Sequence, residues 1–245
     1  EALLEEARSG ARAVSGIVRL RPPAWAGETL RYATRPRPKR AFRSILDAQD
    51  LLAHGATTEV SLEIDGEGVK LHAATDLREG RMVDRIHHDA DLVLRRLERR
   101  VHTKGGGPSR DEIVDFAAGT HPLPASLYVD VAAPFLLGAE PFDGKSRSIY
   151  VWICDRFVAK VYFESRGRHT LTVPAGRFET VEVVMYPDLN DWVPLPAVIT
   201  KLSKPFIPKY HMWYEAQAPH RLVQFEGPHG PPGAPEIVLE LASKG

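Results

Sequence analysis

The 245-residue sequence lacks most of the features that identify a function directly. It holds one cysteine, Cys154, which excludes an intramolecular disulfide and a cysteine-rich zinc site. No apolar run approaches the roughly 20 residues that a membrane-spanning helix needs. The 32 basic and 32 acidic residues cancel, which argues against broad electrostatic binding of nucleic acid. With 43% hydrophobic and 26% charged residues, the composition is that of a globular protein.

Catalytic motifs are missing as well. Neither Gly-x-Ser-x-Gly nor His-Glu-x-x-His occurs, and there is no dinucleotide fingerprint. Gly105–Gly107 lacks the Lys-Ser/Thr pair of a phosphate-binding loop. Cys154 lies in an apolar run, where a buried and inert thiol is expected. The sequence therefore predicts no catalytic residue set and no cofactor.

Two polar clusters come nearest to a metal site. His87, His88 and Asp89 carry groups that hold zinc or iron elsewhere, but adjacent strand residues point to opposite faces, so a polar turn is the preferred interpretation. The stretch Asp188–Asp191 is rich in oxygen ligands but lacks the glycine and terminal glutamate of a calcium loop, which favours an Asx-type turn. We expect no metal site in either cluster.

Positive charge is concentrated in two segments. Arg31–Arg43 carries six basic residues and no acid, and Leu94–Lys104 carries five Lys or Arg against one Glu. We interpret both as solvated strand or loop surface rather than as an anion or nucleic-acid site.

The strongest pattern that is present is Thr170–Pro187, TLTVPAGRFETVEVVMYP. Two alternating runs flank a turn in which Pro174 presets φ and Gly176 tolerates positive φ, so the segment predicts a β-hairpin. Thr58–Ala73 predicts a second hairpin, with its turn at Asp65–Gly68. Further strands are expected at Leu92–His102, Asp111–Phe116, Ser148–Ile153, Phe157–Ser165, His169–Val173, Arg177–Tyr186, Tyr210–Gln217, Arg221–Gly227 and Glu236–Ala242.

Helical spacing is rarer. Ala125–Leu137 is apolar on most sides, so a helix there has to be buried, and Pro134 must kink or divide it. Shorter helices are predicted at Ala2–Val14 and Ala41–His54. The fold class expected is mainly β: an antiparallel barrel or curved half-barrel wrapped around one buried helix, with one or two further short helices. We expect one β-rich domain over residues 1–245, divided into an N-terminal extension, 1–26, and a barrel-like body, 27–245.

Several short stretches resemble a known bacterial family. They are Gly27–Tyr32 (GETLRY), Pro174–Val183 (PAGRFETVEV), Met212–Tyr214 (MWY) and Pro219–Val223 (PHRLV). The family is number 3108 of the domains of unknown function. The resemblance implies a mainly antiparallel barrel or curved half-barrel, often in proteins exported to the cell envelope, with no established catalytic set.

Several late strands are apolar on both faces, as in Ile149–Ile153 and Phe157–Phe163. Both faces must then be covered, by a helix, a partner subunit or a ligand cavity. Packing against the Ala125–Leu137 helix is one interpretation of the aromatic residues on these strands. The other is a ligand-lined cavity, and for it the sequence predicts a binding set of Trp152, Tyr162, Tyr186, His211 and Trp213.

These patterns favour a non-catalytic binding protein, lipocalin-like in outline. It would hold an apolar or amphipathic small molecule, lipid or peptide in a β-barrel-like cavity, with Pro187–Lys209 as a lid or rim. One alternative is an enzyme or accessory protein of a natural-product biosynthetic pathway, with His211, His169 or Asp188 as acid or base.

A second alternative is a protein-interaction module, such as a homodimer that pairs through a strand edge at Gly27–Ala33 or Glu236–Ala242. No nucleic-acid partner and no membrane span are expected. The chain begins at Glu1 without an initiator methionine. Both a cell-envelope or periplasmic location, after removal of a signal peptide, and a cytoplasmic one fit that start.

Overall fold

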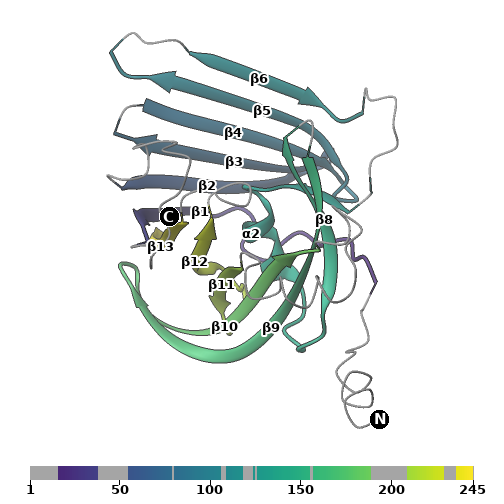
Figure 1. Ribbon diagram of the computed structural model, residues 1–245, viewed down its shortest axis with the longest axis vertical. Coiled ribbons are helices and arrows are strands. Elements are labelled where there is room, and N and C mark those ends of the chain that lie inside the picture. The colour runs from purple at the N-terminus through teal and green to yellow at the C-terminus, as the bar shows by residue number, and fades with distance from the viewer. Residues whose placement is uncertain are drawn as a thin grey trace, which may run out of the picture.

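The computed structural model describes residues 16–37, 55–78, 80–105, 109–117, 124, 126–154, 157–188, 209–228 and 236–244. Most of them lie in one 13-stranded sheet, with strand order β6-β5-β4-β3-β2-β1-β13-β12-β11-β10-β9-β8-β7 (Figure 1). The strands are β1 (Thr29–Pro36), β2 (Ala56–Asp65), β3 (Gly68–Leu77), β4 (Gly80–Asp89), β5 (Leu94–Thr103), β6 (Arg110–Asp115), β7 (Leu127–Val129), β8 (Arg147–Cys154), β9 (Phe157–Val173), β10 (Gly176–Pro187), β11 (Tyr210–Glu215), β12 (Leu222–Pro228) and β13 (Glu236–Lys244). Among these described strands, β7 and β8 are the only pair that runs parallel. The predicted mainly β, antiparallel class is confirmed.

The predicted hairpins form as the turn residues require. Asp65 Oδ1 accepts the backbone N–H groups of Glu67 at 2.8 Å and Gly68 at 3.0 Å, which fixes the turn between β2 and β3. Gly176, with φ of 128°, follows the turn between β9 and β10. β9 is one strand of 17 residues, where the sequence predicted two.

The sheet joins two series of neighbouring strands, β1–β6 and β7–β13, through a seam between β1 and β13. Gly27–Ala33 and Glu236–Ala242, predicted as free edges, therefore belong to strands in the middle of the sheet, and that expectation was wrong. The described sheet instead ends at β6 and β7. Because its order has two ends, the sheet is open and does not form a closed barrel.

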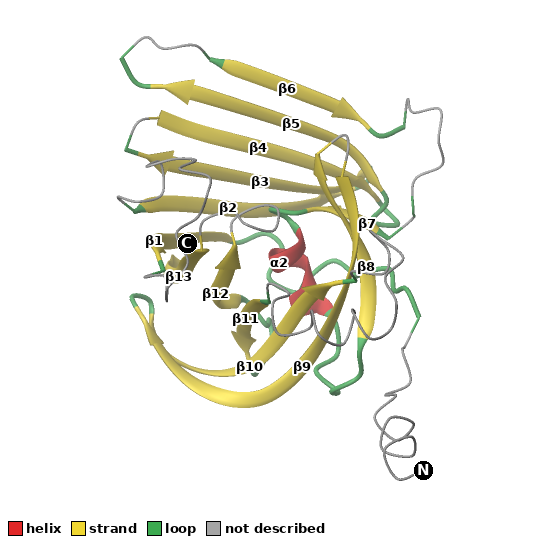
Figure 2. Cartoon of the chain, in the orientation of Figure 1, coloured by secondary structure: helices red, strands yellow, loops and turns green. Residues whose placement is uncertain are grey.

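The predicted helix at Ala125–Leu137 was only partly right. Leu127–Val129 forms β7, and the helix α2 is limited to Ala133–Leu136, extended by the 3-10 turn η1 (Leu137–Ala139). Pro134 does not kink a longer helix but stands in the first turn of a short one, where its missing N–H costs nothing. The segment is buried, as predicted, and is the only α-helix among the described residues (Figure 2). The predicted helices at Ala2–Val14 and Ala41–His54 lie outside those residues.

Four aromatic residues fill one half of the inner face of the sheet. We call this set the aromatic plug: Trp25, Tyr32, Tyr128 and Tyr214, each at most 1% exposed. Every polar tip has a backbone partner, as buried Tyr and Trp require. Trp25 Nε1 donates to Phe135 O at 3.3 Å, Tyr32 to Leu222 O at 3.0 Å and Tyr214 to Pro134 O at 2.6 Å, and Tyr128 Oη accepts from Leu20 N at 2.8 Å.

Two of these bonds hold α2 in place, one from Tyr214 on β11 and one from Trp25 in the turn before β1. A four-residue helix leaves its carbonyl groups without helical partners, and the plug supplies partners for those of Pro134 and Phe135. Gly138 then passes so close to the β11–β12 turn that an added Cβ would lie 2.5 Å from His220 O. The helix is thus held against the inner face beside β11 and β12.

Candidate functional site

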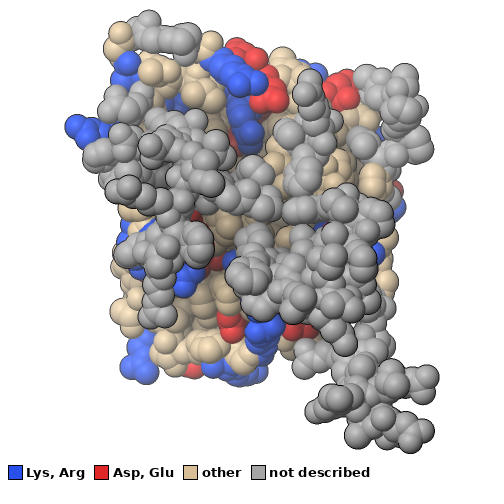
Figure 3. Space-filling view, in the orientation of Figure 1, with Lys and Arg blue, Asp and Glu red and all other residues tan. Residues whose placement is uncertain are grey.

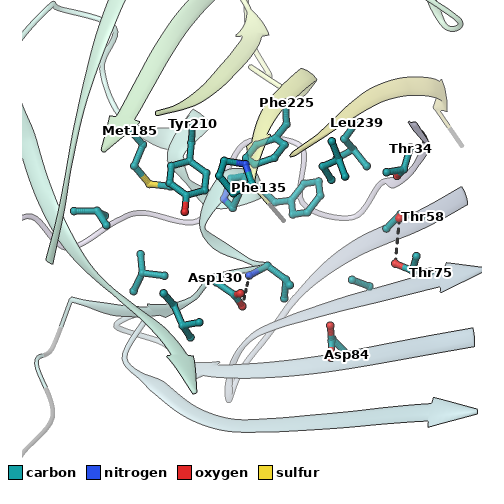
Figure 4. A pocket seen from close by; sticks show the side chains of 18 of the residues that line it. Thr34, Thr58, Thr75, Asp84, Asp130, Phe135, Met185, Tyr210, Phe225 and Leu239 are labelled. Carbon is teal, nitrogen blue, oxygen red and sulfur yellow. Dashed lines mark hydrogen bonds between the residues drawn. The ribbon is translucent and has the colours of Figure 1, made fainter. Parts of the chain in front are cut away.

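The other half of the inner face is hollow. A cavity of about 1090 Å³, its open mouth included, lies between α2 and the sheet (Figure 4). Its lining is mostly apolar and comes from ten strands and the β7–α2 segment: Thr34, Thr58, Ala73, Thr75, Met82, Asp84, Asp130, Val131, Pro134, Phe135, Val151, Ile153, Ala159, Val161, Met185, Pro187, Tyr210, Phe225, Pro228, Ile237 and Leu239. We call the two parts of the inner face the plugged half and the hollow half.

The hollow half follows from side-chain size along each strand. Residues two apart share a face, and on β2 the inward positions run from Leu62 in the plugged half to Thr58 in the hollow half. β3 does the same, from Leu71 to Thr75. Thr58 and Thr75 face each other across the two strands, with hydroxyl oxygens 3.1 Å apart. Small side chains thus replace Leu where the cavity lies.

A partly buried ion pair lies at one wall of the cavity. Asp84, only 2% exposed, lies opposite Arg99 in the β4–β5 register. Arg99 donates to it through Nε at 2.7 Å and Nη2 at 3.4 Å. Although burial lowers the pKa of Arg99, the hydrogen bond and the charge of Asp84 raise it overall, so the guanidinium stays charged. Glu112 on β6 lies on the other side of Arg99.

A second carboxylate faces the same cavity. Asp130 follows β7, and its Oδ1 accepts the N–H of Val131 at 2.8 Å. Burial raises its pKa to about 6, although the positive charge of Arg99 acts against that shift. Burial, with the negative charge of Asp130, raises the pKa of Tyr210 to about 12. Figure 4 shows these groups around one space.

None of the five residues predicted to bind a ligand lines this cavity. Trp152, Tyr162, Tyr186, His211 and Trp213 alternate with residues that line it or share its face, so their side chains lie on the outer face of β8–β11. The structure pairs Tyr162 with Tyr186 and His211 with Trp213, with ring centroids 5.8 Å and 5.9 Å apart. Trp152 packs separately, edge-on against Phe116 at 5.4 Å. Ligand binding by this set stays a prediction.

The acid and base candidates lie on that outer face too. Glu182 holds two histidines, His211 Nδ1 at 2.7 Å and His169 Nε2 at 3.4 Å. Asp188 accepts a hydrogen bond from Tyr162 at 2.9 Å. The neighbours of Asp188 that the sequence placed in an Asx turn lie outside the described residues.

The stretch from His87 differs from its prediction as a turn. His87 and His88 belong to β4, and the turn begins only at Asp89, whose Oδ1 accepts the N–H groups of Asp91 and Val93. His88 is 3% exposed, and neither of its ring nitrogens has a hydrogen-bond partner among the described residues. Burial lowers its pKa to about 4. It lies in the plugged half, with its ring 5.9 Å from that of Tyr128.

All of the basic segment Leu94–Lys104 except its last residue forms β5, and its arginines have acidic partners. Arg95 pairs with Asp89, Arg96 with Glu98, Arg99 with Asp84 and Arg100 with Asp111. On the face in view in Figure 3, basic and acidic side chains lie interspersed. The described residues contain no group of three metal-ligating side chains in a suitable arrangement. Within the same residues, no helix is long and apolar enough to cross a membrane.

Sequence reasoning missed Asp84, Arg99, Asp130 and Tyr210. A signal was present for Asp84, a charged residue at a position where the β4 alternation between Met82 and Ile86 calls for an apolar one. Asp130 likewise interrupts an apolar stretch. Asp84 and Asp130 are thus both charged residues, one at an inward-facing position of a strand and the other directly after a strand.

Comparison with known proteins identifies no relative by sequence. No protein-family model and no curated protein matches the chain, so membership of family 3108 stays an expectation. Among solved structures, the fold is similar to that of a predicted exported protein with a YmcC-like fold from Bacteroides fragilis. The TM-score is 0.32 with 12% identity, over 93% of this chain and 100% of that one. A predicted lipoprotein from Parabacteroides distasonis gives the same TM-score and identity, over 93% of this chain and 99% of that one. At this score the likeness carries no argument about function.

Proposed function

We propose that this protein is a non-catalytic binding protein that holds an apolar or amphipathic small molecule, lipid or peptide in the cavity of the hollow half. One observation carries the proposal: the cavity between α2 and the sheet has mostly apolar walls with a few placed polar groups. That combination is typical of ligand pockets. In this proposal the open sheet acts as a curved half-barrel around α2.

The cavity is supported by the rest of the fold. The aromatic plug fills the neighbouring half and donates hydrogen bonds to two carbonyl groups of α2. These bonds hold α2 in place at the border of the cavity, so that α2 does not have to keep the space open alone. An empty apolar cavity costs stability, because its lining side chains lose packing contacts. A ligand that fills the space recovers those contacts.

The test is to fill the cavity from its wall. Ala159 lines it and is 1% exposed, so Ala159→Phe places a ring in the space that a ligand would take. We expect the affinity for the neutral dye Nile red to fall at least about tenfold, as direct steric competition requires. Fluorescence titration measures the affinity, and native mass spectrometry of gently purified protein detects a retained ligand.

A matched control is Ala33→Phe, which makes the same change on the outer face of β1, next to the cavity-lining Thr34. It should bind the dye as the natural protein does. The proposal fails if the natural protein binds no apolar probe, or if both variants bind the dye equally well.

A further inference from the structure

The charges on the cavity wall are of one sign. Of its lining residues only Asp84 and Asp130 carry a charge, and both are acidic; no Lys, Arg or His is among the described residues that line it. A ligand that enters this space therefore meets an apolar wall with negative charge at one place.

One of the two carboxylates is already neutralised. Asp84 receives both hydrogen bonds of the Arg99 guanidinium, at 2.7 and 3.4 Å. Glu112, opposite Arg99 on β6, adds a further negative charge that is felt by the guanidinium. The positive charge of Arg99 is therefore balanced by Asp84 and Glu112, and it is not available to pair with a ligand.

Asp130 lacks such a partner. Its Oδ1 accepts one backbone N–H, from Val131, and no side chain among the described residues donates to the carboxylate. Arg99 acts on it only through its charge, Asp84 repels it, and the nearby phenol of Tyr210 is neutral at physiological pH. These are the charged and titratable groups that face Asp130 from β4, β5 and β11. Partly buried carboxylates without a cation are costly and tend to mark functional sites.

We propose that the cavity selects ligands with a protonated amine, which pairs with the carboxylate of Asp130 while the apolar part of the ligand packs against Val161, Phe225 and Leu239. This inference rests on the proposed function and names the class of ligand. An ammonium group supplies the missing positive charge and donates the hydrogen bonds that the carboxylate can still accept.

Other head groups fit less well. A carboxylate head would bring a third negative charge beside Asp84 and Asp130, and like charges repel one another. An alcohol donates one hydrogen bond but leaves the charge of Asp130 without compensation. The expected order of affinity is amine, then alcohol, then carboxylate.

The experiment compares three probes with the same chain: dodecylamine, dodecanol and dodecanoate. Each displaces Nile red from the intact protein at pH 7.5, below the concentration at which the probes aggregate. We expect the amine to bind at least about tenfold tighter than the alcohol, as a charge-assisted hydrogen bond allows. In Asp130→Asn the amine should bind no better than the alcohol. Continued binding of dodecanol by this variant shows that its cavity is intact.

Asp76→Asn is the matched control. It removes one carboxylate from β3, but from the outer face, where Asp76 is exposed and pairs with Arg81 at 3.7 Å. The preference for the amine should survive in this variant. If it is lost there too, general surface charge explains the preference and the proposal is wrong.

The pH dependence gives a second readout. Because the pKa of Asp130 is about 6, the binding of dodecylamine should be about tenfold weaker at pH 5 than at pH 7.5, while dodecanol should bind equally at both. Equal binding of amine and alcohol by the natural protein, or tighter binding of dodecanoate, overturns the inference but leaves apolar binding intact. If none of the probes binds, the proposed function fails as well.

Discussion

The plugged half and the hollow half of the inner face are built by the same strands, yet they are packed in opposite ways. On β11, Tyr214 is fully buried and donates to Pro134 O, whereas Tyr210, four residues earlier on the same face, borders open space. Burying larger side chains would have closed the hollow half at a gain in stability. The difference teaches that packing is concentrated in one half of the inner face, while the other half keeps the space that we propose as a ligand site.

The sharpest way to break this comparison is to delete the same side chain from each half. Tyr214→Ala should lower the free energy of unfolding by about 3–5 kcal/mol, because it opens a void in the plug and leaves a backbone carbonyl unpaired. Tyr210→Ala should cost about 1 kcal/mol, since its side chain already faces a cavity. Urea unfolding followed by circular dichroism measures both. Equal losses would show that the two halves are packed alike.

Acid should act first on the plugged half. The pKa of His88 is lowered to about 4 by burial, so the unfolded chain binds the proton more readily. Above pH 6.5 His88 is neutral in the folded and in the unfolded chain, and the fold has its full stability. As the pH falls from 6.5 to 4, the unfolded chain takes up the proton first and the free energy of unfolding decreases. The loss amounts to about 3 kcal/mol. Stability measured against pH should show this slope disappear in His88→Met. His87→Met, on the opposite face of β4, is the control that should retain it.

The hollow half should respond to acid in the opposite direction. The pKa of Asp130 is raised to about 6, so its ionised form destabilises the fold above that pH, and this penalty vanishes as the pH falls below the unfolded value. Asp130→Asn should therefore raise the free energy of unfolding at pH 7.5 by about 1–3 kcal/mol and leave it unchanged near pH 3.5. Urea titrations at the two pH values check this. A loss of stability at pH 7.5 would contradict the idea that the carboxylate is kept at a cost.

The smallest effect is expected at the threonines that face the cavity. Thr58→Val removes one hydroxyl from the Thr58–Thr75 pair, but Thr75 still faces open space, where water can reach it. The free energy of unfolding should change by about 0.5 kcal/mol or less. Thermal unfolding of this variant tests the point. A loss as large as that of Tyr214→Ala would mean that the hollow half is closed in solution.

Sequence patterns predicted most of the strands, although not β4, because alternation and turn chemistry act locally. Asp65–Gly68 and Pro174–Gly176 specify their turns with residues only a few positions apart. The Ala125–Leu137 segment failed for the opposite reason. Leu127–Val129 is a strand only because β8 lies beside it, and that neighbour cannot be read from the segment itself.

The site could not be predicted in the same way. Alternation tells which residues share a face, but it does not tell which face is inside. The sequence predicts a cavity lined by large aromatic residues, whereas Trp152 and Trp213 lie on the face opposite the cavity described above. The cavity is indicated instead by small inward residues such as Thr58 and Ala159, whose meaning depends on which other strands stand opposite them.

The seam between β1 and β13 has a consequence for how the chain folds. It joins residues far apart in sequence, as in the bond from Arg35 to Glu240, which are 205 positions apart. During synthesis β1–β6 leave the ribosome first and can pair as local hairpins. One edge of β1 stays unpaired until β13, which is made much later, has been synthesised. The hydroxyl group of Tyr32 also has no partner until then, because the carbonyl to which it donates belongs to Leu222. The nascent protein therefore carries an unpaired edge and an unfinished inner face until β13 arrives, and this interval is when it is most exposed to aggregation.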